Sequence, residues 1–162
     1  MPADVSALEA YAEKLQRAAN DFKPFAQHVL EQAGEDFLDI VQSEIEAAQN
    51  VDTRLLLSSF TRGGADNVWE LNSGGLTLTI GTRVKYAAYV NDGHRQQPGR
   101  FVPGVWSGDR FQYIPGAKTG MVLKVSFVPG SHYFDKACDA MTGLFGETCR
   151  MEFDRFFQEH FG

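Results

Sequence analysis

The sequence predicts an α+β fold with N-terminal helices, a small antiparallel β-sheet with an inserted short helix, and a long C-terminal helix packed on the sheet. Two patterns indicate this class: apolar residues recur at helical spacing near both ends, and they alternate between residues 67 and 82. A chain of 162 residues that is 43% hydrophobic fits a single domain. We expect a helical arm over residues 1–50, a β-rich core over 51–128 with a long loop at 94–110, and the C-terminal helix over 129–162.

The helical arm is predicted to contain two helices. Ser6 and Glu9 form a capping-box pattern that starts the first helix, which should continue to about Asn20. Pro24 should break that helix and begin a second one, ending near Asn50. The apolar stripe of the second helix consists of Phe25, Val29, Ala33, Phe37, Ile40, Val41 and Ile45. Its acidic face, of a kind that is usually solvated, consists of Glu31, Glu35, Asp36, Asp39, Glu44 and Glu46.

The next segments predict a β-hairpin followed by a short helix. After a short apolar run at residues 55–60, alternating apolar residues lie on both sides of a turn at 72–75, so one face of the hairpin should be buried. Tyr86 and Tyr89 then lie on one face of about two helical turns, which Gly93 can end in the left-handed region. We expect this tyrosine pair to bury a large area where helix, sheet and a mobile loop meet.

Residues 94–110 lack periodicity and contain several prolines, glycines and arginines, so we expect a long irregular loop. Exposed aromatic residues flanked by arginines are typical of interface hot spots. The alternative is that both aromatic side chains of the loop pack back onto the sheet. The predicted partner-binding residues are Arg95, Arg100, Phe101, Trp106 and Arg110.

A second hairpin and the last helix complete the chain. Residues 111–113 and 121–127 should pair through a turn shaped by Pro115, Gly116 and Gly120. Ser131 is a plausible N-cap of a helix that reaches the C-terminus, in which Gly143 and Gly146 mark close packing or a bend. The apolar face of this helix consists of Phe134, Ala137, Met141, Leu144, Phe145, Thr148, Phe153, Phe156 and Phe157.

The distribution of charge is more informative than the net charge of −6. Residues 1–50 carry ten acidic and three basic side chains, a net charge of −7, whereas residues 83–126 carry seven basic and two acidic side chains, a net charge of +5. This basic segment has three interpretations: a nucleic-acid contact, a surface that meets the acidic helices of a neighbouring copy, or an ordinary solvated loop.

The residues predict no catalytic, metal or cofactor-binding site. The four histidines are scattered, without a helical i, i+4 pair, and no serine lies in a nucleophile elbow. Cys138 and Cys149 should lie about 16 Å apart along one helix, beyond disulfide reach, so we expect both to be reduced and partly buried. Because the N-terminus has no signal-peptide pattern and no segment is long and apolar enough to span a bilayer, we expect a soluble protein that is cytoplasmic where it is made.

Four segments, taken in order, resemble the tail-component family of tailed bacteriophages, the small neck and tail-completion proteins of the head–tail junction that are often found in prophages. These segments are residues 51–60, 80–82, 86–94 and 127–137. The residues that carry the motif are Asp52, Thr53, Leu55, Ser58, Tyr86, Tyr89, Gly93 and Phe134. Two departures stand out: Arg54 occupies the position of the usual glycine after the threonine, and residues 95–126 form a longer segment than in the leanest relatives.

The resemblance implies a structural virion protein that acts through assembly, present in the bacterial cytoplasm while particles form and then at the head–tail junction. Its partners would be other copies of itself, in a possible ring, and adjacent neck or tail proteins, with no specific nucleic acid, membrane or small-molecule substrate. A ring requires two different complementary patches on each subunit. The alternatives are a tail-terminator ring protein and a nucleic-acid-binding module built on the basic loop, which would bind DNA with a marked salt dependence.

Overall fold

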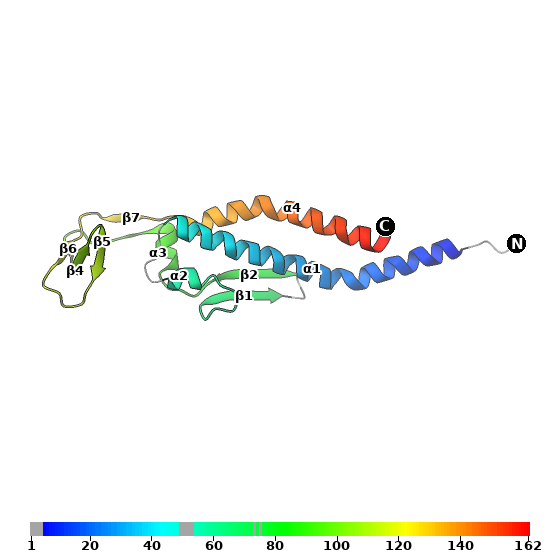
Figure 1. Ribbon diagram of the computed structural model, residues 1–162, viewed down its shortest axis with the longest axis horizontal. Helices are drawn as coiled ribbons and strands as arrows, with labels where there is room; N and C mark the ends of the chain where they lie inside the picture. Colours follow the sequence, from blue (N-terminus) through cyan, green and yellow to red (C-terminus); the bar gives the residue numbers. More distant parts are fainter. Residues whose placement is uncertain (1–4, 49–53, 73, 75) are drawn as a thin grey trace. The chain divides into compact units, whose positions relative to one another are not determined.

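The computed structural model describes residues 5–48, 54–72, 74 and 76–162, and it confirms the mixed α+β class (Figure 1). The helices are α1 (Ser6–Ala47), α2 (Leu55–Ser58), α3 (Ala87–Asp92) and α4 (Tyr133–Phe161). The strands are β1 (Asn67–Asn72), β2 (Thr77–Thr82), β3 (Gly93–Arg95), β4 (Phe101–Ser107), β5 (Arg110–Tyr113), β6 (Gly120–Val122) and β7 (Phe127–Pro129). The chain forms two compact units, a large unit of residues 1–84 and 133–162 and a small unit of residues 85–132.

The helical arm is one continuous helix, so the predicted break at Pro24 is wrong. A proline inside a helix removes one backbone hydrogen bond and costs about 3 kcal/mol or more. Packing on both sides of Pro24 offsets this cost: the Phe22 ring lies 6.2 Å from Phe153 and the Phe25 ring lies 4.5 Å from Phe156. Helix α1 ends at Ala47, where the N–H of the next residue donates to the Glu44 carbonyl; this is close to the predicted end near Asn50, which itself lies outside the described residues.

The core of the large unit lies where α1 meets α4 and the β1–β2 hairpin (Figure 1). The predicted apolar stripe of α1 is buried at most of its positions, with Phe25 and Ile40 partly exposed. The main packing partner of α4 is α1, rather than the sheet that the sequence predicted. The buried hydrophobic side chains of this unit are Ala18, Val29, Ala33, Phe37, Leu38, Val41, Ile45, Leu56, Phe60, Val84, Tyr133, Ala137 and Phe156.

The first hairpin confirms the alternation in the sequence. Trp69 pairs with Ile80 and Leu71 with Leu78 across β1 and β2, so all four side chains share one face. This face packs on the backbone of α1 at Gly34, where a Cβ atom would lie 2.5 Å from both Leu78 and the Trp69 ring. Glycine therefore permits the hairpin to approach α1 closely.

The segment before α2 contains the predicted departure from the family pattern. Arg54 is the N-cap residue of α2 and has a φ of 57°, in the left-handed region that glycine occupies at least cost. Arg54 thus adopts a backbone conformation that glycine, the residue expected here from the resemblance, would adopt at lower cost. The motif residues Asp52 and Thr53 lie outside the described residues.

The short tyrosine helix of the small unit is confirmed, and Gly93 ends it with a φ of 83°. The buried positions of α3 are Ala87 and Asn91, one turn apart. Because a six-residue helix buries only one face, the two tyrosine side chains lie off the buried face: Tyr86 is 37% exposed and Tyr89 is 61% exposed. The prediction that this pair buries a large area is therefore wrong.

The segment predicted as an irregular loop contains strands. Strand β3 pairs with β7, and β4 is the central strand of a three-stranded sheet in the order β5-β4-β6. Residues 101–103 of β4 pair with β6, and residues 104–107 pair with β5. Pro103, which has no backbone N–H to donate, lies at the change from one partner strand to the other. The predicted second hairpin is also wrong, because residues 111–113 and β6 both pair with β4 and not with each other.

The C-terminal helix is confirmed, although it begins two residues after the predicted N-cap. The hydroxyl of Ser131 instead donates to the Val90 carbonyl at 3.1 Å. A Cβ atom at either Gly143 or Gly146 would meet open space, so close packing does not explain these glycines. Cys138 and Cys149 are both free, as expected, but Cys138 is exposed rather than partly buried.

Candidate assembly surfaces

The small unit presents an extensive apolar surface. Its only buried hydrophobic side chain is that of Ala87. Small sheets normally bury at least one apolar face against another layer. Large exposed apolar groups on a soluble protein usually mark an interaction surface. Ten residues of this unit belong to that class: Tyr86, Tyr89, Phe101, Val105, Trp106, Tyr113, Ile114, Val122, Val125 and Phe127.

The structure exposes both predicted aromatic anchors but does not bring them together. Phe101 is 50% exposed and Trp106 is 58% exposed, so neither is packed back into a core. Since side chains alternate along a strand, these positions of β4 lie on opposite faces of the sheet. Trp106 contacts the Phe111 ring at 5.3 Å, whereas Phe101 pairs with Val122. The predicted hot spot is thus divided between two faces.

The predicted arginines are exposed and distributed around these strands. Arg95 ends β3, Arg100 precedes β4, and Arg110 begins β5 opposite Ser107. The small unit contains six Lys and Arg residues and two Asp residues, a net charge of +4. Its surface is consequently both basic and apolar.

The face of the sheet that bears Trp106 is hollowed. A cavity of about 680 Å³ lies beside Trp106 and is lined by Gln96, Val128 and residues 121–125. Met121 pairs with Val102 in the strand register, which places it on the same face as Trp106. This face is therefore concave, with a shape into which projecting side chains of a partner could fit.

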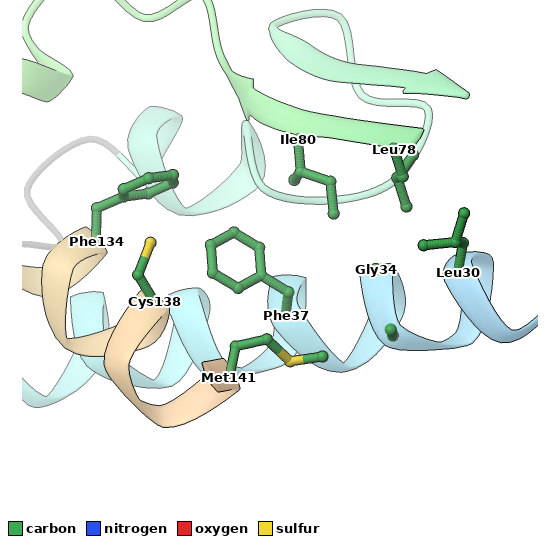
Figure 2. Close-up of a pocket in the computed structure, with 9 residues that line it drawn as sticks. Leu30, Gly34, Phe37, Leu78, Ile80, Phe134, Cys138 and Met141 are labelled. Atoms are coloured by element: carbon green, nitrogen blue, oxygen red, sulfur yellow. The ribbon is translucent and has the colours of Figure 1, made fainter. Parts of the chain in front are cut away.

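A second apolar surface lies in the large unit, where α1, β2 and α4 form a groove of about 330 Å³ (Figure 2). Figure 2 shows Phe134, Cys138 and Met141 of α4 facing Phe37 of α1, with Ile80 of β2 across the groove. Although the residue as a whole is exposed, desolvation of the Cys138 thiol against the groove raises its pKa, and the nearby Asp135 and Asp139 carboxylates raise it further. The groove lining, from here called the α1/β2/α4 groove, consists of Leu30, Ala33, Gly34, Phe37, Leu78, Ile80, Phe134, Cys138 and Met141.

Part of the acidic face of α1 is already paired within the large unit. The guanidinium of Arg62 donates to Glu35 at 2.7 Å and to Glu31 at 3.1 Å, and it lies 4.3 Å from the centre of the Trp69 ring. The hydrogen bonds to Glu35 and Glu31 raise the pKa of Arg62. Arg62 therefore links α1 to the segment before β1 and to the Trp69 ring, while Asp39 of the same helix stays exposed.

The described motif residues shape local structure instead of forming one site. Leu55 and Ser58 are the first and last residues of α2, and the Ser58 hydroxyl donates to the Leu55 carbonyl at 3.0 Å. Tyr86 is the N-cap residue of α3, Tyr89 lies within the helix, and Gly93 is its C-cap residue. Phe134 packs against Phe37, with ring centres 5.5 Å apart, and so lines the α1/β2/α4 groove.

Sequence reasoning missed this groove and the residues that define it. In the sequence, Met141 belongs only to an apolar helical face, Leu78 and Ile80 belong only to the alternating apolar residues of the hairpin, and Gly34 and Arg62 carry no distinct signal. The groove depends on three elements that are distant in sequence, so no local pattern could predict it. Among the described residues, no group of three or more His, Cys, Asp or Glu side chains could hold a metal ion, and no helix is long and apolar enough to cross a membrane.

Residues 6–93 match the family model described as "Bacteriophage HK97-gp10, putative tail-component". The chain belongs to this family. It is similar to the phage-like element PBSX protein XkdI of Bacillus subtilis, with 49% identity over 122 residues that cover 74% of this chain and 76% of XkdI. It is also similar to uncharacterized protein YqbI of the same bacterium, with 39% identity over 165 residues that cover 97% of this chain and 99% of YqbI. No solved structure matches the chain.

Membership of a tail-component family gives the protein a structural, tail-related role in the phage particle. The resemblance proposed from the sequence is therefore confirmed at the level of the family.

Proposed function

We propose that the protein is a component of the phage head–tail junction, of the neck or tail-completion type, that acts through protein–protein assembly and has no catalytic activity. The observation that supports this proposal is the small unit, which combines a net charge of +4 with ten exposed large apolar residues and a single buried one. Its partners are other copies of the chain and adjacent neck or tail proteins.

The proposal follows because an isolated small sheet lacks a second layer that would bury its apolar face. Two or three strands need an apolar face packed on another layer to be stable in water. In the small unit, the strands β4, β5 and β6 leave large apolar residues exposed and leave the outer edges of β5 and β6 unpaired within the sheet. A neighbouring subunit would bury these side chains, at about 25 cal/mol for each Å² of apolar surface removed from water.

A ring arrangement would use both units. Closed rings require a heterologous interface, in which each subunit offers two different complementary patches. The large unit contains nine Lys and Arg residues and 19 Asp and Glu residues, a net charge of −10, and so complements the small unit. A tail-terminator ring is the alternative role within the same class.

The first test is a charge reversal of the small unit. The test variant carries Arg95→Glu, Arg100→Glu and Arg110→Glu, and the control variant carries Arg17→Glu, Lys23→Glu and Arg150→Glu in the large unit. We expect the test variant to fold, as judged by circular dichroism, but to lose self-association by light scattering and to fail to restore complete particles in a phage that lacks the protein. The control should retain both, and normal assembly by the test variant would refute the proposal.

The basic, aromatic surface of the small unit also favours a second candidate, a nucleic-acid-binding module. That function predicts binding to duplex DNA that weakens steeply as salt rises, because each phosphate contact releases counterions. The assembly proposal predicts little DNA binding by the free protein. Fluorescence anisotropy with a labelled duplex at low and moderate salt separates the two.

A further inference from the structure

We propose that the α1/β2/α4 groove of one copy receives the Trp106 face of the small unit of a second copy. This inference rests on the proposed assembly function and specifies which surfaces meet. It differs from the expectation that the acidic face of α1 alone is the acceptor, since that face is partly occupied by Arg62.

The groove has the character of an acceptor for a few large apolar side chains. Its volume of about 330 Å³ lies at the lower end of the range for binding sites, roughly 300–1,000 Å³. Its lining comes from three elements and is apolar apart from one thiol. Such a groove is too small for a helix or a strand, but it can accommodate one or two large side chains.

The Trp106 face supplies side chains of that kind. Trp106 is the most exposed apolar residue of β4, and the register puts Phe111 and Tyr113 on the same face. Tryptophan and tyrosine are enriched among interface anchors because they bury large areas with few rotatable bonds. Burial of Trp106 in an apolar groove would remove from water the side chain that the small unit leaves most exposed on this strand.

Charge favours the same pairing over contact between two small units. Asp135 and Asp139 lie close enough to Cys138, at the groove, to act on its thiol electrostatically. Arg110 begins β5 directly after the turn that follows β4, so an arginine accompanies the aromatic anchor Trp106. Opposite charges at the rim of an interface steer association and fix its register. Two small units, each with a charge of +4, would instead repel one another.

Because donor and acceptor differ, the contact is head-to-tail. Each copy that docks its small unit leaves its own groove free for another copy. Repetition of the contact therefore produces a closed ring or an open chain. A symmetric dimer, in contrast, would require a self-complementary patch.

Cross-linking to Cys138 tests the inference directly. The Cys149→Ser background leaves Cys138 as the only native thiol. Tyr113→Cys adds a thiol on the Trp106 face, and the matched control Gln112→Cys adds one at the adjacent position on the opposite face. Both proteins are treated with a short bis-maleimide at a pH of about 8.5, because the raised pKa of Cys138 slows its reaction at neutral pH.

We expect Tyr113→Cys to give a ladder of covalent dimers and larger species on denaturing gels, at least tenfold more abundant than with Gln112→Cys. Equal ladders, or a cross-link within single chains, would overturn the inference. Light scattering on the same samples distinguishes failure of the groove contact from failure of the proposed function. Self-association without a specific ladder refutes the groove contact alone, whereas monomers at every concentration refute self-assembly of the free chain and with it the contact.

A groove-filling variant provides a second test that leaves the Trp106 face intact. Cys138→Trp places an indole in the groove from an exposed position, and Ala140→Trp adds the same side chain at an exposed position nearby on α4. We expect Cys138→Trp to weaken self-association at least tenfold and Ala140→Trp to leave it within about twofold, with unchanged circular dichroism for both. Equal association by the two variants would contradict the assignment of the groove.

Discussion

Replacement of Phe156 by alanine tests whether the aromatic contacts between α1 and α4 hold the large unit together. Phe156 is 7% exposed, and its ring lies 4.5 Å from Phe25, 6.3 Å from Phe22 and 4.3 Å from His160. Deletion of a buried phenylalanine side chain costs about 3–5 kcal/mol. Because Phe22 is itself 42% exposed and the cluster can partly collapse, we expect a loss of about 3 kcal/mol in the free energy of unfolding.

The measurement is thermal and urea unfolding followed by circular dichroism, at a concentration low enough to exclude self-association. For a chain of this length, about 3 kcal/mol corresponds to a fall in Tm of roughly 6–12 °C. The control is Phe157→Ala, the same substitution at the next residue, which is 55% exposed. It should cost about 1 kcal/mol, in proportion to the smaller area that it buries. Equal losses for the two variants would refute the packing argument.

The remaining predictions concern two glycines and one histidine. Gly143→Ala should raise the free energy of unfolding by up to about 1 kcal/mol, since its Cβ meets open space on a helix; a loss in urea unfolding would contradict this. Gly34→Ala should lower the free energy of unfolding by up to about 2 kcal/mol, because the added Cβ atom would overlap the Leu78 side chain. A higher free energy of unfolding in this variant would mean that the hairpin can shift away from α1 at no cost. The hydrogen bond to Asp21 raises the pKa of His160, so this stabilisation is complete below about pH 6.5 and is lost as pH rises through the folded-state pKa. Asp21→Asn should therefore reduce the fall in Tm between about pH 5.5 and pH 8, and an unchanged pH profile would exclude this pair as its source.

Local periodicity predicted the elements whose apolar faces are continuous. The stripe from Phe25 to Ile45 and the alternation from Trp69 to Ile80 are both set by one buried face, so spacing alone identified the helix and the hairpin. The continuity of α1 through Pro24 could not be predicted in this way. It depends on aromatic residues of α4 that are more than 100 positions away in the sequence.

The same limit applies to the candidate site: local sequence patterns indicate some of its residues, whereas its geometry depends on residues that are distant in the sequence. Composition indicated Phe101 and Trp106 as candidate interface anchors but left open whether they pack back onto the sheet, and the structure shows that both are exposed. Their separation onto opposite faces required knowledge that β4 exists, and Pro103 and Gly104 obscured that strand in the sequence. Contacts between α1, β2 and α4 create the groove, which is a property of tertiary structure alone.

The near absence of a core in the small unit has a consequence for the timing of assembly. With Ala87 as its only buried hydrophobic side chain, this unit should open at low free-energy cost, and its amide protons should exchange far faster than those of α1. Ordering such a segment on docking offsets part of the binding free energy, so a first contact between two copies is weak. In the proposed assembly, free copies should therefore associate only at high concentration, and a platform that presents several contacts at once would strengthen the same weak contact.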